Sequence, residues 1–465
     1  MLKFGEPNRP NSDFKFHTKP LPFQEIAFNW LWENSGGGLL LDPGMGKTKV
    51  ALDFIYSKKY TRPIVVAPIP LLREWVKQAG DHRPELKMNI VTKTNPLKEG
   101  EVNLIGYRRF QLQSDLVSKF NPDFIALDEG LIKNPSSKRT VEVQNITLDV
   151  PERILMTGTL INNTPTDVFG PIRFLEPALV GYKFTKFRDR YSIRNPKVPY
   201  YDCLGYRDTE EISEIIAACC IVMKKEDWMN YLPKKIYEEI QIPMPEFLRT
   251  VYREIRNNYI TEINGHVFAY DNPLSVFGAL TQVTCGFLKK DDQIFDLGEY
   301  PKLEKMVEII TEKREKAIVW FNYTHEGNLA EEYLRKASIS YLRVDGKTKS
   351  VFDSVSQFNS TGIQVLLSQS KVLNYGQTIM GNDKGPFEFL VSQTVRLHIF
   401  LSESWSAEVS RQQEDRTHRI GAKSDSIYIR LLMSPVDKVI REAIKEKRDI
   451  DRTIMMRACT RDEVD

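Results

Sequence analysis

The sequence predicts an α/β fold with two doubly wound parallel-sheet lobes and a helical insertion between them. Three patterns indicate this fold. Short apolar runs alternate with helical periodicity over residues 20–175, the alternation returns over residues 301–449, and residues 174–235 between them have a mainly helical pattern. Strands of a parallel sheet are buried on both faces and are joined by helices, so they appear as short apolar runs. A chain of 465 residues has room for two or three domains.

The composition narrows the class of protein. Hydrophobic residues make up 41% of the chain, which supports large cores, and the net charge is only +3, so local basic patches must carry any argument for a nucleic-acid partner. No apolar run approaches the length of a membrane span, and the first twenty residues contain no apolar signal core. The five cysteines show no metal-ligand spacing and fit a reducing compartment, so we expect a cytoplasmic protein.

The strongest local signal is a turn with two glycines between a strand and a helix. An apolar run at 39–41 precedes Gly44 and Gly46, and Lys47 and Thr48 then open a helical pattern. Glycines let backbone N–H groups close on phosphate oxygens, and the helix N-terminus adds partial positive charge. We expect Lys47 to reach the terminal phosphates of ATP and Thr48 to ligate Mg²⁺. A glycine-rich turn of an ordinary α/β protein is the alternative.

An acidic pair after the apolar run at 124–127 argues against that alternative. Downstream of a phosphate loop, Asp128 is expected to hold Mg²⁺ through water and Glu129 to polarise the attacking water. Gln24 begins a helical pattern ahead of the loop, and its amide can pair with an adenine edge, although such a glutamine is often only solvated. The predicted cofactor-binding residues are Gln24, Gly44, Met45, Gly46, Lys47 and Thr48, with Thr48 and Asp128 as metal ligands.

Two basic segments are candidates for nucleic-acid contact. Arg108 and Arg109 lie between aromatic residues, and the segment 182–207 interleaves positive charges with rings. This composition suits phosphate neutralisation with base stacking, and it equally suits a solvated helical face over an aromatic core. Hydroxyl residues that end the strand at 154–156 can link a hydrolysis site to a bound phosphodiester. The candidate contacts are Arg108, Arg109, Thr157, Lys183, Lys186, Arg188, Arg190 and Arg194.

The second half of the chain repeats the alternation of strands and helices without a phosphate loop. A lobe of this kind should supply groups to a nucleotide that is bound elsewhere. Gln412, Arg416 and Arg419 are spaced by four and three residues, which predicts that they share one helical face. Two arginines on one face can meet a transferring phosphate bidentately, whereas a surface helix with scattered salt bridges is the alternative. The predicted catalytic residues are Lys47, Glu129, Gln412, Arg416 and Arg419.

The order of these motifs resembles that of superfamily 2 helicases. The residues that follow the helicase order are Gln24, the 44–48 loop, Asp128–Glu129 and the Thr-Gly-Thr string at 157–159. The strings at 128–138 and 155–163 and the His-Arg-Ile-Gly string at 418–421 look like the Swi/Snf branch of that superfamily. Gly130 and Leu131 depart from the alanine and the histidine or glutamine that are usual there, and the Leu131 side chain cannot hydrogen-bond.

The resemblance implies two RecA-like lobes that bind ATP and Mg²⁺ in lobe 1, close on ATP with the arginines of lobe 2 and step along double-stranded DNA. The helical insertion that grips duplex DNA in this family falls on the basic segment. The compact chain resembles small phage and bacterial members that remodel branched DNA. We therefore expect branch migration or fork remodelling, in replication, recombination or repair, by a monomer in a bacterial or phage-infected cytoplasm. An RNA helicase, the motor subunit of a restriction system and a non-catalytic nucleotide-binding module are the alternatives.

The resemblance also predicts how the chain is divided. Lobe 1 is expected at residues 1–173, the helical insertion at 174–235, a linker and the start of lobe 2 at 236–300, the rest of lobe 2 at 301–449 and a charged, frayed tail at 450–465. About fifteen residues, Gly381–Thr394, exceed the family pattern, and 387–391 within them could form a hairpin. We expect this extra segment to serve work on branched DNA.

Overall fold

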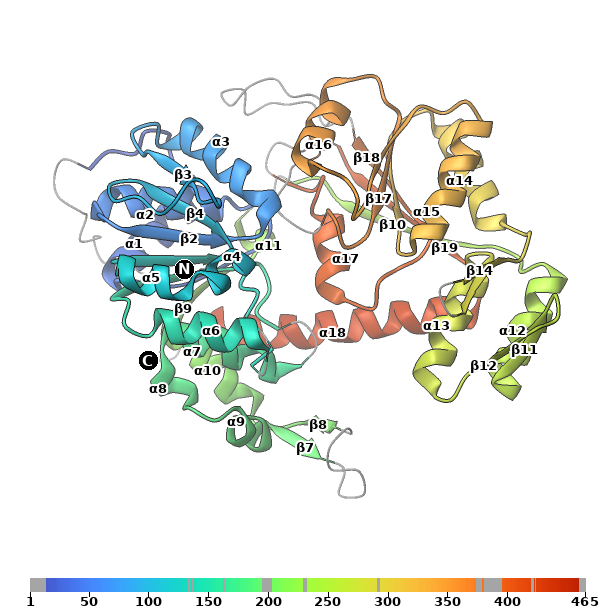
Figure 1. Ribbon diagram of the computed structural model, residues 1–465, viewed down its shortest axis with the longest axis horizontal. Coiled ribbons are helices and arrows are strands. Elements are labelled where there is room, and N and C mark those ends of the chain that lie inside the picture. The colour runs from blue at the N-terminus through green and yellow to red at the C-terminus, as the bar shows by residue number, and fades with distance from the viewer. Residues whose placement is uncertain are drawn as a thin grey trace. The chain divides into compact units, whose positions relative to one another are not determined.

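The computed structural model describes residues 14–132, 134–135, 137–161, 164–194, 203–228, 232–290, 293–373, 379, 395–419, 422 and 424–459. Two compact units divide the chain: unit 1 comprises residues 1–231 and 447–465, and unit 2 comprises residues 232–446. Each unit contains one sheet of parallel strands, so the prediction of an α/β fold with two parallel-sheet lobes is confirmed (Figure 1). None of the described helices is long and apolar enough to span a membrane.

Unit 1 is built on a seven-stranded sheet with the order β3-β4-β2-β5-β6-β1-β9, in which all neighbours are parallel. Its strands are β1 Gly36–Leu41, β2 Pro63–Ala67, β3 Met88–Ile90, β4 Val102–Gly106, β5 Phe124–Asp128, β6 Glu152–Met156 and β9 Cys220–Met223. The helices of the first 175 residues are α1 Pro22–Glu33, α2 Lys47–Lys58, α3 Leu72–His82, α4 Tyr107–Leu112, α5 Ser114–Phe120, α6 Lys138–Thr147 and α7 Phe169–Leu175. Two 3₁₀ turns lie at Ile69–Leu71 and Pro165–Val168.

Helices cover both faces of this sheet. Helices α1, α2 and α3 pack together on one side, and α4, α6, α7 and α10 pack together on the other (Figure 1). Alternate residues of the strands point to the two sides: Leu40, Ile125 and Leu127 join the core beneath the second group of helices. This double coverage explains why the strands appear in the sequence as continuous apolar runs.

The segment expected as a helical insertion is mixed. It contains α8 Pro177–Val180, α9 Phe184–Tyr191, the antiparallel pair β7 Ser192–Arg194 and β8 Cys203–Tyr206, α10 Thr209–Cys219, strand β9 and α11 Lys225–Trp228. Strand β9 pairs with β1 and is therefore part of the main sheet, which the sequence did not indicate. The described rest of the segment, helices α8 to α11 and the β7–β8 pair, lies outside that sheet.

Unit 2 is built on a six-stranded parallel sheet with the order β10-β19-β18-β15-β17-β16. Its strands are β10 Lys235–Gln241, β15 Lys316–Phe321, β16 Tyr341–Val344, β17 Val365–Gln369, β18 Val395–Phe400 and β19 Ser426–Leu432. Its helices are α12 Glu246–Asn258, α13 Pro273–Thr284, α14 Pro301–Lys313, α15 Thr324–Lys336, α16 Val351–Ser360, α17 Ala407–Glu414 and the start of α18 Pro435–Cys459.

The segment 236–300, expected to hold a linker and the start of lobe 2, is folded into unit 2. Strand β10 lies at one edge of the sheet, and two antiparallel hairpins accompany α12 and α13. Helix α12 buries Leu248, Val251, Tyr252 and Ile255, which recur at the helical spacing of three and four residues. The hairpins are β11 Ile260–Ile263 with β12 His266–Ala269, and β13 Phe287–Lys290 with β14 Gln293–Asp296.

Two predictions concern single segments of the C-terminal half, the tail and the extra segment. Helix α18 continues to Cys459, so most of the tail that was expected to be frayed is helical. The extra segment Gly381–Thr394 lies outside the described residues.

Candidate functional site

The loop after β1 has the shape of a phosphate cradle. Gly44 and Gly46 both adopt left-handed backbone conformations, with φ angles of 85° and 80°, and Gly46 caps the N-terminus of α2. The Met45 side chain is buried beneath the loop, and the Lys47 Nζ atom donates a hydrogen bond of 2.9 Å to the main-chain oxygen of Leu41. The ammonium group therefore lies over the end of β1, where the exposed N–H groups of the helix start can also meet an anion.

Gln24 is a structural partner of this loop. Its side-chain oxygen accepts a hydrogen bond of 3.0 Å from the Leu21 N–H, and its amide nitrogen donates one of 3.1 Å to the Met45 main-chain oxygen. A Cβ atom on Gly46 would lie only 2.3 Å from that nitrogen, so a side chain there would displace the Gln24 amide, and the left-handed φ angle itself favours glycine. The role of Gln24 toward adenine stays a prediction, because the amide has to exchange a main-chain partner for the base.

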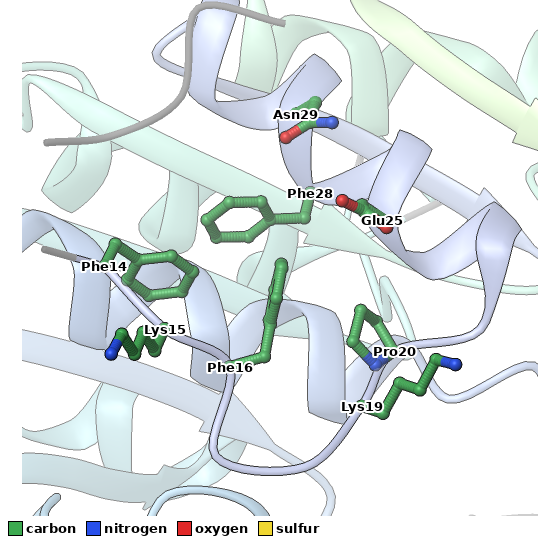
Figure 2. Close-up of a pocket in the computed structure, with 8 residues that line it drawn as sticks. All are labelled: Phe14, Lys15, Phe16, Lys19, Pro20, Glu25, Phe28 and Asn29. Atoms are coloured by element: carbon green, nitrogen blue, oxygen red, sulfur yellow. The ribbon is translucent and has the colours of Figure 1, made fainter. Parts of the chain in front are cut away.

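A pocket of about 380 Å³ opens beside the same helix (Figure 2). Three phenylalanine rings form its apolar wall, with ring centroids 5.0 to 5.2 Å apart. Charged and amide side chains complete the wall, and two of them come from α1, one and five positions after Gln24 (Figure 2). The lining residues are Phe14, Lys15, Phe16, Lys19, Pro20, Glu25, Phe28 and Asn29. Aromatic rings with polar groups at the rim suit a flat heterocycle that also hydrogen-bonds.

Neighbouring strands support the loop from two sides. The Asp42 N–H donates to the Met223 main-chain oxygen at 3.2 Å, and the Asp42 carboxylate accepts from the Lys225 N–H at 2.9 Å and lies 3.6 Å from the Lys224 ammonium. On the other side, a Cβ atom on Gly158 would lie 2.7 Å from the Pro43 ring. Strand β9 and the Thr-Gly-Thr string thus hold the base of the loop.

The acidic pair ends β5. Asp128 pairs with Met156 of β6, and β6 pairs with β1, so the acidic pair and the loop lie at the carboxyl ends of three adjacent strands. The Trp75 indole donates a hydrogen bond of 2.8 Å to the Asp128 carboxylate. Burial, and after it the charge of Glu129, raises the pKa of Asp128 to about 7. A carboxylate held this way gains most from a nearby cation, as metal ligation requires.

The donor set fits Mg²⁺. The Thr48 hydroxyl lies in the first turn of α2, and the Asp128 carboxylate lies at the end of β5, so both predicted ligands offer hard oxygens. Mg²⁺ is commonly held by one or two protein oxygens, water and the phosphates of the substrate. Thr157 does not fit its predicted role, because its side chain is fully buried and its hydroxyl bonds to the Thr159 main chain at 2.7 Å. Thr157 therefore shapes the loop and does not face a nucleic acid.

The prediction that Gln412, Arg416 and Arg419 share one helical face is wrong. These residues form the arginine segment of unit 2, at and after the end of α17. Helix α17 ends at Glu414, so Gln412 lies in the helix but Arg416 and Arg419 lie in the turns that follow it, and the three do not share a helical face. The Tyr428 hydroxyl donates to the Glu414 main-chain oxygen at 2.7 Å and so gives a partner to one of the last carbonyls of the helix, which have no donor within it. The Arg419 Nε atom donates to the Asp415 main-chain oxygen at 2.7 Å.

Ion pairs fix the place where that helix ends. The Glu414 carboxylate accepts from the Tyr237 hydroxyl at 2.9 Å and from the Arg430 guanidinium at 3.0 Å. The Lys235 ammonium lies 3.1 Å from the Asp415 carboxylate. Burial lowers the pKa of Lys235, but the charges of Asp415 and Glu414 outweigh burial and hold it above its usual range. Gln412, Arg416 and Arg419 are all buried.

The basic segment around α9 divides into core and surface. Phe187 and Tyr191 are buried, and their rings pack against one another and, through Phe187, against Phe169. The prediction that these rings stack on bases is therefore wrong for Phe187 and Tyr191, because the rings belong to the core of unit 1. The two rings thus form an aromatic core under the helix, and the role of its positive charges toward nucleic acid stays a prediction.

The positive charges of the same segment are on the surface. Lys183, Lys186 and Arg190 are exposed and Arg188 is half-buried, and Arg190 pairs with Glu211 at 2.6 Å. Arg188 lies 3.3 Å from its neighbour Asp189. In α4, Arg108 is exposed and Arg109 is half-buried. The side chain of Arg194 lies outside the described residues.

The sequence was compared with models of known protein families. A family model described as the SNF2-related domain matches residues 23–286, which is more than half of the 465 residues. The chain belongs to the SNF2-related family. The match spans the phosphate loop, the acidic pair and the basic segment, so the family assignment and the geometry concern the same part of the chain.

The SNF2-related chain is also similar to larger proteins. It is 23% identical to the transcription regulatory protein SNF2 of Saccharomyces cerevisiae over 93% of this chain and 27% of the yeast protein. It is 23% identical to the human DNA annealing helicase and endonuclease ZRANB3 over 90% of this chain and 39% of that protein, and 21% identical to the human DNA excision repair protein ERCC-6 over 89% and 31%. The chain thus spans about a third of the length of these relatives.

A solved structure matches the SNF2-related chain along its length. It is the Sulfolobus solfataricus SWI2/SNF2 ATPase core in complex with double-stranded DNA, with 20% identity, a TM-score of 0.45, and coverage of 99% of this chain and 97% of that one.

Several residues of the SNF2-related site were missed by sequence reasoning. They support the predicted residues through side-chain bonds that join distant parts of the chain: Asp42, Trp75, Tyr107 and Lys224. The aromatic residues near the arginines of α4 were noticed only for their composition. No local pattern indicates which tryptophan or tyrosine will reach a given carboxylate.

Proposed function

We propose that this chain hydrolyses ATP and uses the energy to translocate on double-stranded DNA. The observation that carries the proposal is the convergence of Lys47, Asp128 and Glu129 at the carboxyl ends of three adjacent parallel strands in unit 1. In open parallel sheets this edge is where ligands bind. The family assignment and the names of the DNA-acting relatives support the same reading.

Each of the candidate side chains has a separate proposed role in hydrolysis. Lys47 holds the terminal phosphates, and Glu129, at the edge of the site, accepts a proton from the attacking water. Mg²⁺, when bound through Thr48 and Asp128, would neutralise phosphate charge. Arg416 and Arg419 of unit 2 would stabilise the charge of the transferring phosphate, with Gln412 beside them. The base of ATP would lie in the aromatic pocket next to α1.

The nucleic-acid partner is proposed to be duplex DNA held through its phosphates. Lys183, Lys186 and Arg108 offer exposed positive charge on unit 1. Because Phe187 and Tyr191 are buried, these two rings are not available for base stacking, and the proposed recognition through α9 rests on charge. Branch migration or fork remodelling is the finer proposal, supported by the annealing-helicase name of one relative.

The deciding experiment is a panel of ATPase rates with no nucleic acid, linear duplex DNA, a four-way DNA junction and RNA of equal length. We expect stimulation by DNA that exceeds stimulation by RNA, and the highest rate on the junction. Preference for RNA would favour an RNA helicase, and absence of hydrolysis in every arm would favour a nucleotide-binding module. Equal rates on linear and four-way DNA would agree with translocation on duplex DNA and would contradict the proposal of branch migration or fork remodelling. Lys47→Ala serves as the inactive control.

A further inference from the structure

Tyr107 closes the short turn that carries Glu129. It is the first residue of α4, and its side chain is buried. Its hydroxyl donates a hydrogen bond of 2.8 Å to the Asp128 main-chain oxygen and accepts a longer one of 3.4 Å from the Leu131 N–H. These two main-chain groups flank Glu129 and Gly130, so one side chain bridges the entrance and the exit of the turn.

The turn needs such a restraint. Glu129 adopts a left-handed backbone conformation with a φ angle of 58°, which costs a non-glycine residue on the order of 1 kcal/mol. Gly130 follows with a φ angle of 45°, and a Cβ atom there would lie 3.3 Å from the Leu155 side chain. Leu131 has no polar side-chain atom, so only its main chain can be held. The bridge from Tyr107 therefore adds to the bond of 2.7 Å from the Ile132 N–H to the Gly130 oxygen.

The same tyrosine belongs to a helix with surface positive charge. Arg108, the next residue in α4, is exposed, and the Arg139 guanidinium lies 5.9 Å from the Tyr107 ring. A contact that shifts α4 would move the tyrosine hydroxyl, because the ring is packed at the start of that helix. The hydroxyl is thus a direct physical connection between a candidate DNA-contacting helix and the turn of Glu129.

We propose that Tyr107 is a positioning residue for hydrolysis: its hydroxyl holds the Glu129 turn in the conformation that activates water and makes that conformation depend on α4. This inference rests on the proposed function, in which Glu129 accepts the proton of the attacking water. The Tyr107 side chain is buried and its hydroxyl bonds to main-chain groups of the turn, so we expect it to contact neither ATP nor DNA. Its contribution is therefore to turnover and not to the affinity for either ligand.

The first test is the Tyr107→Phe variant of the full chain, which keeps the ring and removes the hydroxyl. We expect kcat with duplex DNA to fall at least about tenfold, a loss of about 1.4 kcal/mol, while KM for ATP and Kd for duplex DNA change less than about twofold. The ratio of rates with and without DNA should also fall. A kcat within about twofold of the wild type would overturn the proposal, and a lower kcat with unchanged stimulation would overturn the link to α4.

Tyr60→Phe is the matched control. The Tyr60 ring stacks on Phe124 at the opposite end of the same strand β5, with centroids 4.5 Å apart, and its hydroxyl bonds to Glu152. This variant also removes a tyrosine hydroxyl from unit 1, but far along the strand from the turn. We expect a small loss in stability and an unchanged kcat.

A double-mutant cycle with Glu129→Gln decides whether Tyr107 acts through Glu129. Residual turnover of Glu129→Gln should not fall further when Tyr107→Phe is added, since the group that the tyrosine positions is already gone. If the two substitutions lower kcat independently, so that their effects multiply, the proposal is overturned. This holds even if Tyr107→Phe lowers Tm, because all rates are measured below the melting temperatures of the wild type and the variants. Wild-type protein that lacks DNA-stimulated hydrolysis would instead refute the proposed function itself.

Discussion

The Tyr428 hydroxyl donates a hydrogen bond of 2.7 Å to the main-chain oxygen of Glu414. This bond gives a partner to the carbonyl of the last residue of α17 and stabilises the chain in leaving the helix there. As a result, Arg416 and Arg419 lie in turns held by side chains of β10 and β19, and not on a helical face. Turns fixed in this way restrict the directions in which the two guanidinium groups can point. A substitution that changes the shape of either group should therefore not be compensated by movement of the main chain.

Replacing either arginine with lysine should remove turnover. Lysine keeps the charge but loses the planar fork, so Arg416→Lys and Arg419→Lys should each lower DNA-stimulated kcat on the order of a thousandfold, or about 4 kcal/mol at the transition state. Affinity for DNA should change little. The matched control is Arg396→Lys, because Arg396 lies in the same unit, partly exposed and paired with Glu315 at 2.7 Å. Normal hydrolysis by both variants would disprove the role of unit 2 in catalysis.

Lys47→Ala should abolish ATP hydrolysis and leave the fold intact. The ammonium group bonds to the Leu41 oxygen at 2.9 Å, so its loss should cost only about 1 kcal/mol of stability while it removes the contact with the terminal phosphates. ATPase rate and thermal unfolding measure the two effects. Lys58→Ala, at the other end of α2, removes a lysine paired with Glu152 and should hydrolyse ATP normally. Turnover by Lys47→Ala within a few-fold of wild type would refute the phosphate cradle.

Phe16→Ala should weaken ATP binding without changing kcat. The Phe16 ring forms part of the pocket wall, and base–aromatic stacking contributes about 1 to 3 kcal/mol, so KM for ATP should rise about tenfold or more. Inhibition by inorganic tripolyphosphate, which has no base, should be the same for wild type and variant. If ATP and tripolyphosphate are weakened equally, the ring supports the fold of the loop and does not contact the base.

Charge reversal at Lys183 and Lys186 should weaken duplex binding and flatten its dependence on salt. Each phosphate contact contributes about 0.9 to the slope of log K against log salt, so the double variant Lys183→Glu/Lys186→Glu should lose close to two units of slope. Lys93→Glu/Lys119→Glu changes the net charge equally at exposed positions of unit 1 and is the matched control. Equal slopes for both double variants would show that α9 is a solvated surface without a role in DNA binding.

Acid should destabilise unit 2 through His398. Burial lowers the pKa of His398 to about 3, and its Nδ1 atom accepts a hydrogen bond of 3.1 Å from the Trp320 indole. The unfolded chain takes up a proton near pH 6.5 but the folded chain does not, so the free energy of unfolding should fall by about 2 kcal/mol between pH 7 and pH 5. Urea unfolding of wild type and His398→Gln at both pH values measures this term, which the variant should lack. Identical pH dependence in the two proteins would contradict the assignment.

The same histidine ring also contacts the segment that carries Arg416 and Arg419. The His398 Nε2 atom bonds to the Thr417 hydroxyl at 2.7 Å, and Thr417 directly follows Arg416. A change in the ring that disturbs this bond would therefore disturb the turn between the two arginines. Because the folded chain keeps His398 neutral at pH 7, ATPase activity at pH 7, compared in wild type and His398→Gln, reports on that link.

The amino-acid sequence by itself determined the parts of this protein that depend on local patterns. The apolar runs, the two glycines with Lys47 and Thr48, and the Asp128–Glu129 pair identify a parallel α/β fold and a phosphate-binding edge, because strand burial and turn conformation are set by residues close in the chain. The left-handed φ angles of Gly44 and Gly46 agree with what those positions predict.

Only the tertiary structure decided how distant residues meet. The end of α17 depends on Tyr428 and Lys235, the orientation of Asp128 on Trp75, and the turn of Glu129 on Tyr107. The rings of α9 were compatible with stacking on bases until packing against the core of unit 1 buried two of them. The physical reason is common to all of these cases: a side-chain hydrogen bond or a buried ring stabilises one arrangement through partners from other strands, and helical or strand periodicity carries no information about those partners.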